Sequence, residues 1–172
     1  MISAIWDIET SGLKSNFAVL LAGGIKPYQG EPKMFTGKRK GENDKELCIA
    51  IKNELEKYDL LYSFYGLGFD LKFLNSRLAR WGEKTLSRKL HVDLYRVVKK
   101  RFNTHSKSLG AVTEFLGISG KTHLNFEIWM QAALEGDKKA LSSIVEHCRQ
   151  DLIITEKLLD RVKDGIISIS LS

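Results

Sequence analysis

Ile5-Trp6-Asp7-Ile8-Glu9-Thr10-Ser11-Gly12-Leu13 is the stretch that decides the fold of this chain. Its apolar residues predict a buried strand over residues 2–8, followed by a Ser-Gly turn. Because side chains alternate along a strand, Asp7 and Glu9 project from the same face. Neighbouring carboxylates repel each other unless a cation lies between them, and hard oxygen ligands suit Mg²⁺ or Mn²⁺. A solvated acidic pair at a strand end is the simpler alternative.

The composition is that of a soluble globular protein. The chain has 172 residues, of which 43% are hydrophobic and 28% charged, and this length suits one domain over residues 1–172. No apolar run reaches the roughly 18–20 residues needed to cross a bilayer, and no secretory signal is apparent. We therefore expect a cytoplasmic protein without membrane contact, in which Cys48 and Cys148 are reduced, buried thiols.

The formal net charge of +6 favours a polyanionic partner such as nucleic acid. Each basic cluster alone is most simply a solvated surface patch. Taken together with an acidic site, the positive charge is what an enzyme needs to hold a phosphodiester chain over carboxylates. The clusters are Lys38-Arg39-Lys40, Lys84 with Arg88 and Lys89, Lys99-Lys100-Arg101, and Lys138-Lys139.

The hydrophobic pattern predicts an α/β fold with a mixed sheet flanked by helices. The tail over residues 165–172 is compatible with a strand or a frayed end. Three antiparallel strands are expected first, over residues 2–8, 17–23 and 33–36, and two later strands over 60–64 and 90–94. Helices are expected from Asn43 or Asp44 to residue 58, and over 71–81, 108–116, 126–134 and 137–162.

Two further acidic positions accompany the N-terminal pair. Asp70 follows a buried strand and a glycine-bearing turn and opens a helix, so a plain N-cap is the simpler interpretation of Asp70 alone. His147 and Asp151 are four residues apart and share one helix face. A solvent-side His–Asp pair would have the same spacing.

In this order, the three acidic positions resemble the DEDD superfamily of 3′–5′ exonucleases, the DnaQ-like branch of the RNase H-like fold. The layout is also similar to YprB-type members and to the proofreading domains of family-B polymerases. The resemblance covers nearly the whole chain and implies one RNase H-like exonuclease domain with a mixed five-stranded sheet. Its motifs are Asp7-Ile8-Glu9-Thr10 with Gly12-Leu13, then Gly68-Phe69-Asp70-Leu71-Lys72-Phe73-Leu74, and then His147 with Asp151.

The resemblance also implies a mechanism with two divalent cations, Mg²⁺ or Mn²⁺, and release of nucleoside 5′-monophosphates. Asp7 would bridge the ions, Glu9 and Asp151 would hold the ion that binds the attacking water, and Asp70 would help with the other. His147 would orient the water as a base. The positions that contact the terminal nucleotide in relatives correspond here to Thr10, Gly12 and Leu13.

The chain departs from the family pattern at two places. The third motif has the spacing of the tyrosine branch, Tyr-x-x-x-Asp, but carries His147, the residue of the branch with His-x-x-x-x-Asp. One helical residue rotates a side chain by about 100°, so His147 need not lie where that branch places its base. Relatives commonly have asparagine where this chain has Tyr65, which could instead stack on a base.

The main hypothesis is therefore a 3′–5′ exonuclease acting on single-stranded DNA or RNA. A structure-specific endonuclease on the same fold and a catalytically quiet nucleic-acid-binding or partner-binding module are the alternatives. The resemblance is compatible with a polymerase, helicase or other DNA repair partner. Asp93 is either an extra acid or, as the pattern favours, the cap of the next helix. We expect core or surface roles for Trp6, Phe69, His91, His105 and His123.

Overall fold

A mixed sheet forms the centre of the fold in the computed structural model, which describes residues 1–37, 43–166 and 170–171. The cluster Lys38-Arg39-Lys40 lies outside these residues. The strand order is β3-β2-β1-β4-β5-β6. The first three strands are antiparallel, as predicted, and β4 and β5 run parallel to β1. Their bounds are β1 Ser3–Thr10, β2 Leu20–Pro27, β3 Lys33–Thr36, β4 Leu60–Ser63 and β5 Leu90–Asp93.

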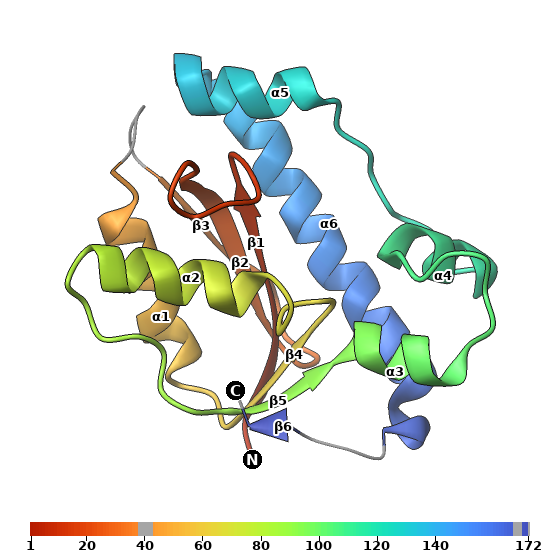
Figure 1. Ribbon diagram of the computed structural model, residues 1–172. Helices are drawn as coiled ribbons and strands as arrows, with labels where there is room; N and C mark the ends of the chain where they lie inside the picture. Colours follow the sequence, from red (N-terminus) through yellow and green to blue (C-terminus); the bar gives the residue numbers. More distant parts are fainter. Residues whose placement is uncertain (38–42, 167–169, 172) are drawn as a thin grey trace.

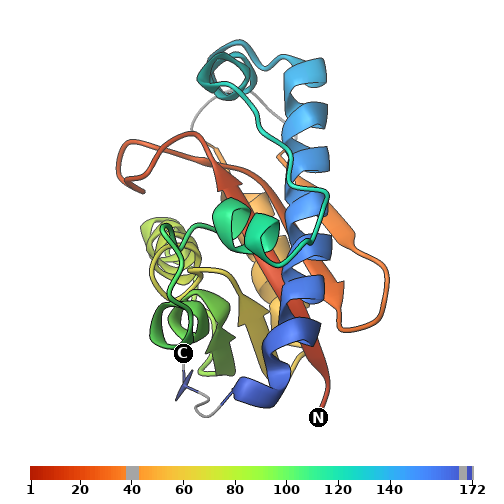
Figure 2. The same ribbon diagram turned by 90° about the vertical axis from the view of Figure 1, so that its right-hand side faces the viewer.

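The five predicted strands are joined by a sixth from the C-terminal tail. This strand, β6 (Ser170–Leu171), pairs antiparallel with β5, so the tail ends in a short strand. Helices flank the sheet, as Figures 1 and 2 show. They are α1 Lys45–Leu55, α2 Asp70–Arg80, α3 Leu94–Arg101, α4 Leu109–Phe115, α5 Phe126–Met130 with the π-helical η1 Gln131–Glu135, and α6 Lys138–Val162 with the 3₁₀ turn η2 Lys163–Gly165.

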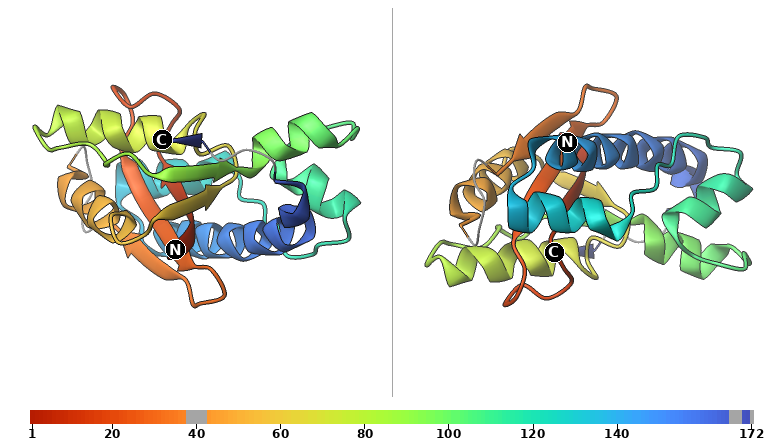
Figure 3. Two further views of the ribbon diagram at one scale, coloured as in Figure 1. Left: turned by 90° about the horizontal axis from the view of Figure 1, so that it is seen from below. Right: turned by 90° about the horizontal axis from the view of Figure 1, so that it is seen from above.

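The alternation of β1 assigns its two faces to different helices. Ala4, Trp6 and Ile8 are buried in a core cluster with apolar residues of α1 and α2. Asp7 lies on the opposite face, where its backbone carbonyl meets Cys148 of α6. The views along the vertical axis show the sheet between these helical layers (Figure 3). No helix among the described residues is long and apolar enough to cross a membrane.

The second strand begins later than the sequence predicts. Its expected start, Phe17, lies instead in a turn in which the Phe17 and Ala18 amides both donate to the Lys14 carbonyl at 2.9 Å. The Phe17 side chain is 88% exposed. This apolar residue therefore belongs to a surface loop and not to the strand. At its other end, β2 extends to Pro27, which pairs with Ala4 near the start of β1.

Side chains cap several helices at the predicted positions. The Ser108 and Asp137 side chains accept from the backbone N–H groups of Ala111 and Ala140, at 3.3 and 2.6 Å. Asp44 occupies the N-cap position of α1, but its carboxylate makes no cap hydrogen bond. The predicted helix over residues 126–134 is present as α5 followed by η1, so α-helical geometry ends at Met130.

A buried ion pair uses the Asp44 carboxylate instead. Both Nε and an Nη of Arg77 donate to Asp44 at 2.8 Å, and the Leu20 amide and the Trp81 indole donate to the same carboxylate at 2.8 Å. Arg77 also donates to the Ser15 carbonyl at 2.9 Å. The pair thus joins α1 and α2 to the loop between β1 and β2.

We predict that Arg77→Ala lowers the free energy of unfolding by about 3–5 kcal/mol, because it leaves the Asp44 carboxylate buried without its counter-charge. For a chain of this size the melting temperature should fall by roughly 10 °C. Differential scanning fluorimetry measures it, with Arg80→Ala, an exposed position on the same helix, as the matched control. Equal melting temperatures for the two variants would contradict the prediction.

Candidate active site

The end of β1 is free of strand pairing on one side. β4 pairs with Ser3, Ala4 and Ile5 only, so β1 continues past it. The Ile8 amide on this free edge donates to Asp70 Oδ1 at 3.1 Å. Asp70 is the first residue of α2 and makes no cap there, since Phe69 holds the N-cap position. The plain N-cap interpretation of Asp70 is therefore wrong: its carboxylate reaches across to β1.

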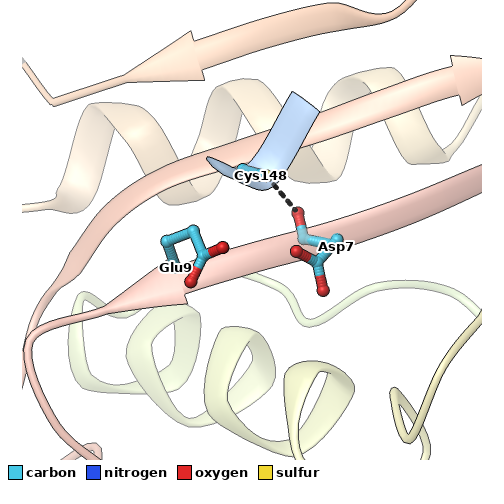
Figure 4. Close-up of side chains that lie close together, drawn as sticks. All are labelled: Asp7, Glu9 and Cys148. Carbon is cyan, nitrogen blue, oxygen red and sulfur yellow. Dashed lines mark hydrogen bonds between the residues drawn. The ribbon is translucent and has the colours of Figure 1, made fainter. Parts of the chain in front are cut away.

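Asp7 and Glu9 lie side by side on the face of β1 that α6 covers. Each has a carboxylate oxygen that lies within 4.8 Å of the other's and of Cys148 Sγ. Figure 4 shows the two acids from one strand, with the Cys148 thiol donating to the Asp7 backbone carbonyl at 3.8 Å. Opposite Asp7 in β2 is Gly24, where a Cβ atom would come within 2.5 Å of the Leu152 side chain. The glycine lets α6 pack close to the acidic pair.

The third acidic position lies on α6 beside a histidine. His147 Nε2 is 3.8 Å from Asp151 Oδ2, which also forms an ion pair with Lys121 Nζ. Asp151 Oδ1 is buried and has no hydrogen-bond partner among the described residues. His147 Nδ1 is 2.6 Å from the Thr122 hydroxyl, and the Trp129 ring meets the imidazole edge-on. The imidazole is therefore held on two sides.

Burial and neighbouring negative charge raise the pKa values of three carboxyl groups at this site. Burial raises the pKa of Asp7 well above its ordinary value, and the charges of Asp70 and Asp151 raise it further. Burial, followed by the charge of Asp7, raises the pKa of Glu9 in the same way. Burial raises the pKa of Asp70 to about 7 against the hydrogen bond from Ile8. Lys121 partly offsets the negative charge at Asp7 and Glu9.

This donor set fits a hard divalent cation. Carboxylate oxygens are the ligands that such ions prefer, and a cation compensates the negative charge that, after burial, raises the pKa values of Asp7 and Glu9. The unpartnered Oδ1 of Asp151 offers a further lone pair. Asp7 and Glu9, with Asp151 and Asp70 nearby, are the residues that could hold it.

The residues expected at the substrate side lie around the loop between β1 and β2. The Thr10 hydroxyl donates to the Gly12 carbonyl at 2.8 Å, so it shapes the turn. A Cβ atom on Gly12 would lie 3.4 Å from Ala18, so this glycine packs within the loop. Leu13 is 80% exposed and lines, with Phe69, a pocket of about 340 Å³ between the loop and α2.

Tyr65 occupies a strained turn just before α2. Its φ is 68°, which is unusual for a bulky residue. Its ring lies over Gly68, where a Cβ atom would come within 2.6 Å of the ring, and Tyr95 packs edge-on at 4.9 Å between centroids. The ring is still half-exposed. Tyr65 is therefore held in place while one side remains accessible.

Asp93 holds this turn. It accepts from the Tyr95 amide at 3.1 Å, which confirms the predicted cap of α3. It also accepts from the Tyr65 and Leu67 amides at 2.8 and 3.1 Å. One carboxylate therefore joins the start of α3 to the turn before Asp70.

Some contacts of the site have no motif in the sequence. Lys121 and Thr122 lie in the irregular segment between α4 and α5, and nothing in their neighbours distinguishes them from surface residues. The structure also confirms the core and surface positions expected for the remaining residues. Trp6, Cys48 and Cys148 are buried and Phe69 packs on the core, His91 is buried and bonded to Ser63, and His105 and His123 are exposed.

Comparisons with known proteins agree with this architecture. No curated protein matches the chain. The structure is similar to that of the family B DNA polymerase from the hyperthermophilic archaeon Pyrobaculum calidifontis, with a TM-score of 0.78 and 16% sequence identity. The match covers 95% of this chain and 24% of the polymerase. The model of the RNase_H superfamily matches residues 4–163. With a match over nearly its whole length and the mixed sheet expected for that fold, the chain belongs to the RNase_H superfamily.

Proposed function

We propose that this protein is a metal-dependent 3′–5′ exonuclease that removes nucleoside 5′-monophosphates from single-stranded DNA or RNA. The observation that carries the proposal is the convergence of Asp7, Glu9, Asp70 and Asp151 at the free end of β1. These carboxylates come from three distant segments and lie close together although they repel one another; Asp70 is buried and the other three are partly buried. Members of the RNase_H superfamily that are nucleases typically use divalent metals, which such a group suits.

The four carboxylates would hold Mg²⁺ or Mn²⁺. Bound divalent cations would supply an acidified water as nucleophile and charge stabilisation at the leaving oxygen. Asp7, at the centre of the group, is electrostatically linked to both Asp70 and Asp151. Asp70 is fixed by the Ile8 amide and Asp151 by α6, so the protein holds these ligands in place before substrate arrives.

His147 would take the proton of the attacking water. Burial lowers the pKa of His147, so its imidazole is neutral near pH 7. When Nδ1 carries the proton and donates to Thr122, the lone pair of Nε2 is free to accept another. Nε2 lies 3.8 Å from Oδ2 of Asp151, one of the proposed metal ligands, and would accept the proton on that side.

The substrate side would be formed by exposed apolar and aromatic groups. Leu13 and Tyr65 lie on the two segments that flank Asp70 and present accessible side chains to a terminal nucleotide. Thr10 and Gly12 would contribute by shaping the loop that carries Leu13. Since the structure is similar to part of a family B DNA polymerase, we also propose that a polymerase, helicase or repair partner works with this chain.

Asp7→Asn should reduce nuclease activity by more than about 1,000-fold, because it removes the central ligand of the group. The assay uses 5′-labelled single-stranded DNA and RNA of one sequence with Mn²⁺, Mg²⁺ or EDTA. The parent should give a metal-dependent ladder that shortens from the 3′ end. Asp164→Asn, at an exposed position, is the control.

Three outcomes would count against the exonuclease. Equal rates for Asp7→Asn and the parent would show that the acidic group takes no part in the reaction. Internal cuts without progressive shortening would indicate the endonuclease. Intact strands with folded protein in all conditions would favour the quiet binding module.

The stability of the protein in EDTA should fall between about pH 5 and pH 8. Burial raises the folded-state pKa of Asp70 from 3.8 to about 7 and raises those of Asp7 and Glu9, so the folded state binds protons that the unfolded state has released. At pH 8, Asp7→Asn should therefore melt roughly 3–8 °C above the parent.

Metal should reverse this pattern. Millimolar Mn²⁺ should raise the melting temperature of the parent more at pH 8 than at pH 5.5, since bound ions compete with protons for the carboxylates. Asp7→Asn should lose most of that shift. A parent without any Mn²⁺-dependent shift at pH 8 would speak against a metal centre.

His147→Ala should lower kcat by about 10²–10⁴-fold while the Mn²⁺ concentration for half-maximal activity stays within a few fold. The acidic limb of the pH–rate profile, which reports protonation of the base, should change in the same variant. Thr122→Val, which keeps the imidazole but removes its hydroxyl partner, should have a smaller effect. Unchanged turnover in His147→Ala would remove His147 from the mechanism.

A further inference from the structure

The segment that follows β5 has an unusual charge pattern. Over residues 94–113 the sequence has five lysines and arginines and no aspartate or glutamate. Four of these basic residues lie on α3 and are exposed: Arg96, Lys99, Lys100 and, at the end of the helix, Arg101. None of the four has a salt bridge among the described residues. Their charges are thus available to a polyanion.

The spacing of Arg96, Lys99 and Lys100 places them on one strip of the helix. Tyr95 and Lys99 are four residues apart, as are Arg96 and Lys100, so each pair stacks along the helix. The opposite face is fixed in the core by Leu94 and Val98, both fully buried. The strip therefore cannot rotate inward, and it faces solvent along the full helix, about 12 Å for eight residues.

The strip begins at the rim of the acidic site. Asp93 binds both the first turn of α3 and the turn of Tyr65, which precedes Asp70. The half-exposed Tyr65 ring touches Tyr95, the first residue of the strip. In Figure 1, α3 starts where β5 ends and points away from β1. An aromatic surface at the site thus continues directly into a row of positive charges.

We infer that α3 is the track for the single strand on the 5′ side of the bond that is cut. The bases would stack on Tyr65, and the phosphates that follow would pass Arg96, Lys99 and Lys100. This inference rests on the proposed function, which brings the 3′ end to the carboxylates. Stacking aromatics beside a positive groove are how proteins hold single strands without reading their sequence.

The variant Arg96→Ala/Lys100→Ala tests the track. For the 12-mer of thymidylate, kcat/KM should fall at least 10-fold relative to kcat/KM for the dinucleotide, which is too short to reach α3. The matched control is Lys84→Ala/Arg88→Ala, which removes the same two charge types from exposed positions between α2 and β5 and should retain the parent's ratio.

Binding provides a readout that needs no catalysis. Fluorescence anisotropy with the labelled 12-mer in EDTA gives the affinity as a function of salt. Each phosphate neutralised on a single strand contributes about 0.7 to the slope of log K against log salt. The slope for Arg96→Ala/Lys100→Ala should therefore be smaller than that of the parent by about 1.4.

The two proposals fail in different ways. If the parent degrades the 12-mer but the variant keeps the parent's ratio and salt slope, the track is wrong and the nuclease stands. If the parent hydrolyses neither substrate, the proposed function fails, and a salt slope lowered by the variant would still establish α3 as a strand-binding surface. If both variants lower the slope equally, the effect is one of net charge and the track is overturned.

Discussion

Repulsion among the carboxylates gathered at the end of β1 is the constraint around which this structure is arranged. Burial raises the pKa values of Asp7, Glu9 and Asp70, and neighbouring carboxylates raise those of Asp7 and Glu9 further, while the ammonium group of Lys121 partly compensates the charge at these two. Such a group lowers the stability of the folded chain at neutral pH. A fold retains it only if other contacts hold the ligands in place, and each segment of the site has such a contact.

These supports lie outside the acidic group itself. The Asp44–Arg77 pair holds the loop of Leu13 through the Ser15 carbonyl, and Asp93 holds the turn of Tyr65 through two backbone amides. Both supporting carboxylates are buried and satisfied by several donors. Buried polar groups of this kind destabilise the fold when some of their hydrogen bonds are missing, and they make it rigid when all of the bonds are formed. The loops that would meet a substrate are thus fixed by hydrogen bonds that take no part in the chemistry.

The fold class and the side-by-side placement of the acidic residues on β1 and α6 could be predicted from the sequence, because both follow from local periodicity. Alternation placed Asp7 and Glu9 on one face, and helical spacing placed His147 beside Asp151, as the structure has them. What could not be predicted depends on contacts between distant segments. Phe17 looked like a strand residue but lies in a turn, and Lys121 and Thr122 reach the site from a segment without a pattern. Asp70 taken alone looked like a cap, and only the family resemblance placed it with the other acids, where its carboxylate binds β1.

The unpaired end of β1 explains how this sheet brings the acidic residues together. β4 pairs with the first part of β1 only, so the Ile8 amide on the unpaired edge needs another acceptor, which Asp70 supplies. The hydrogen bond satisfies the Ile8 amide. It also holds Asp70, the first residue of α2, on the side of the acidic pair of β1. A longer β4 would pair with Ile8 and leave Asp70 without its anchor. The length difference between two neighbouring strands is therefore what assembles the site.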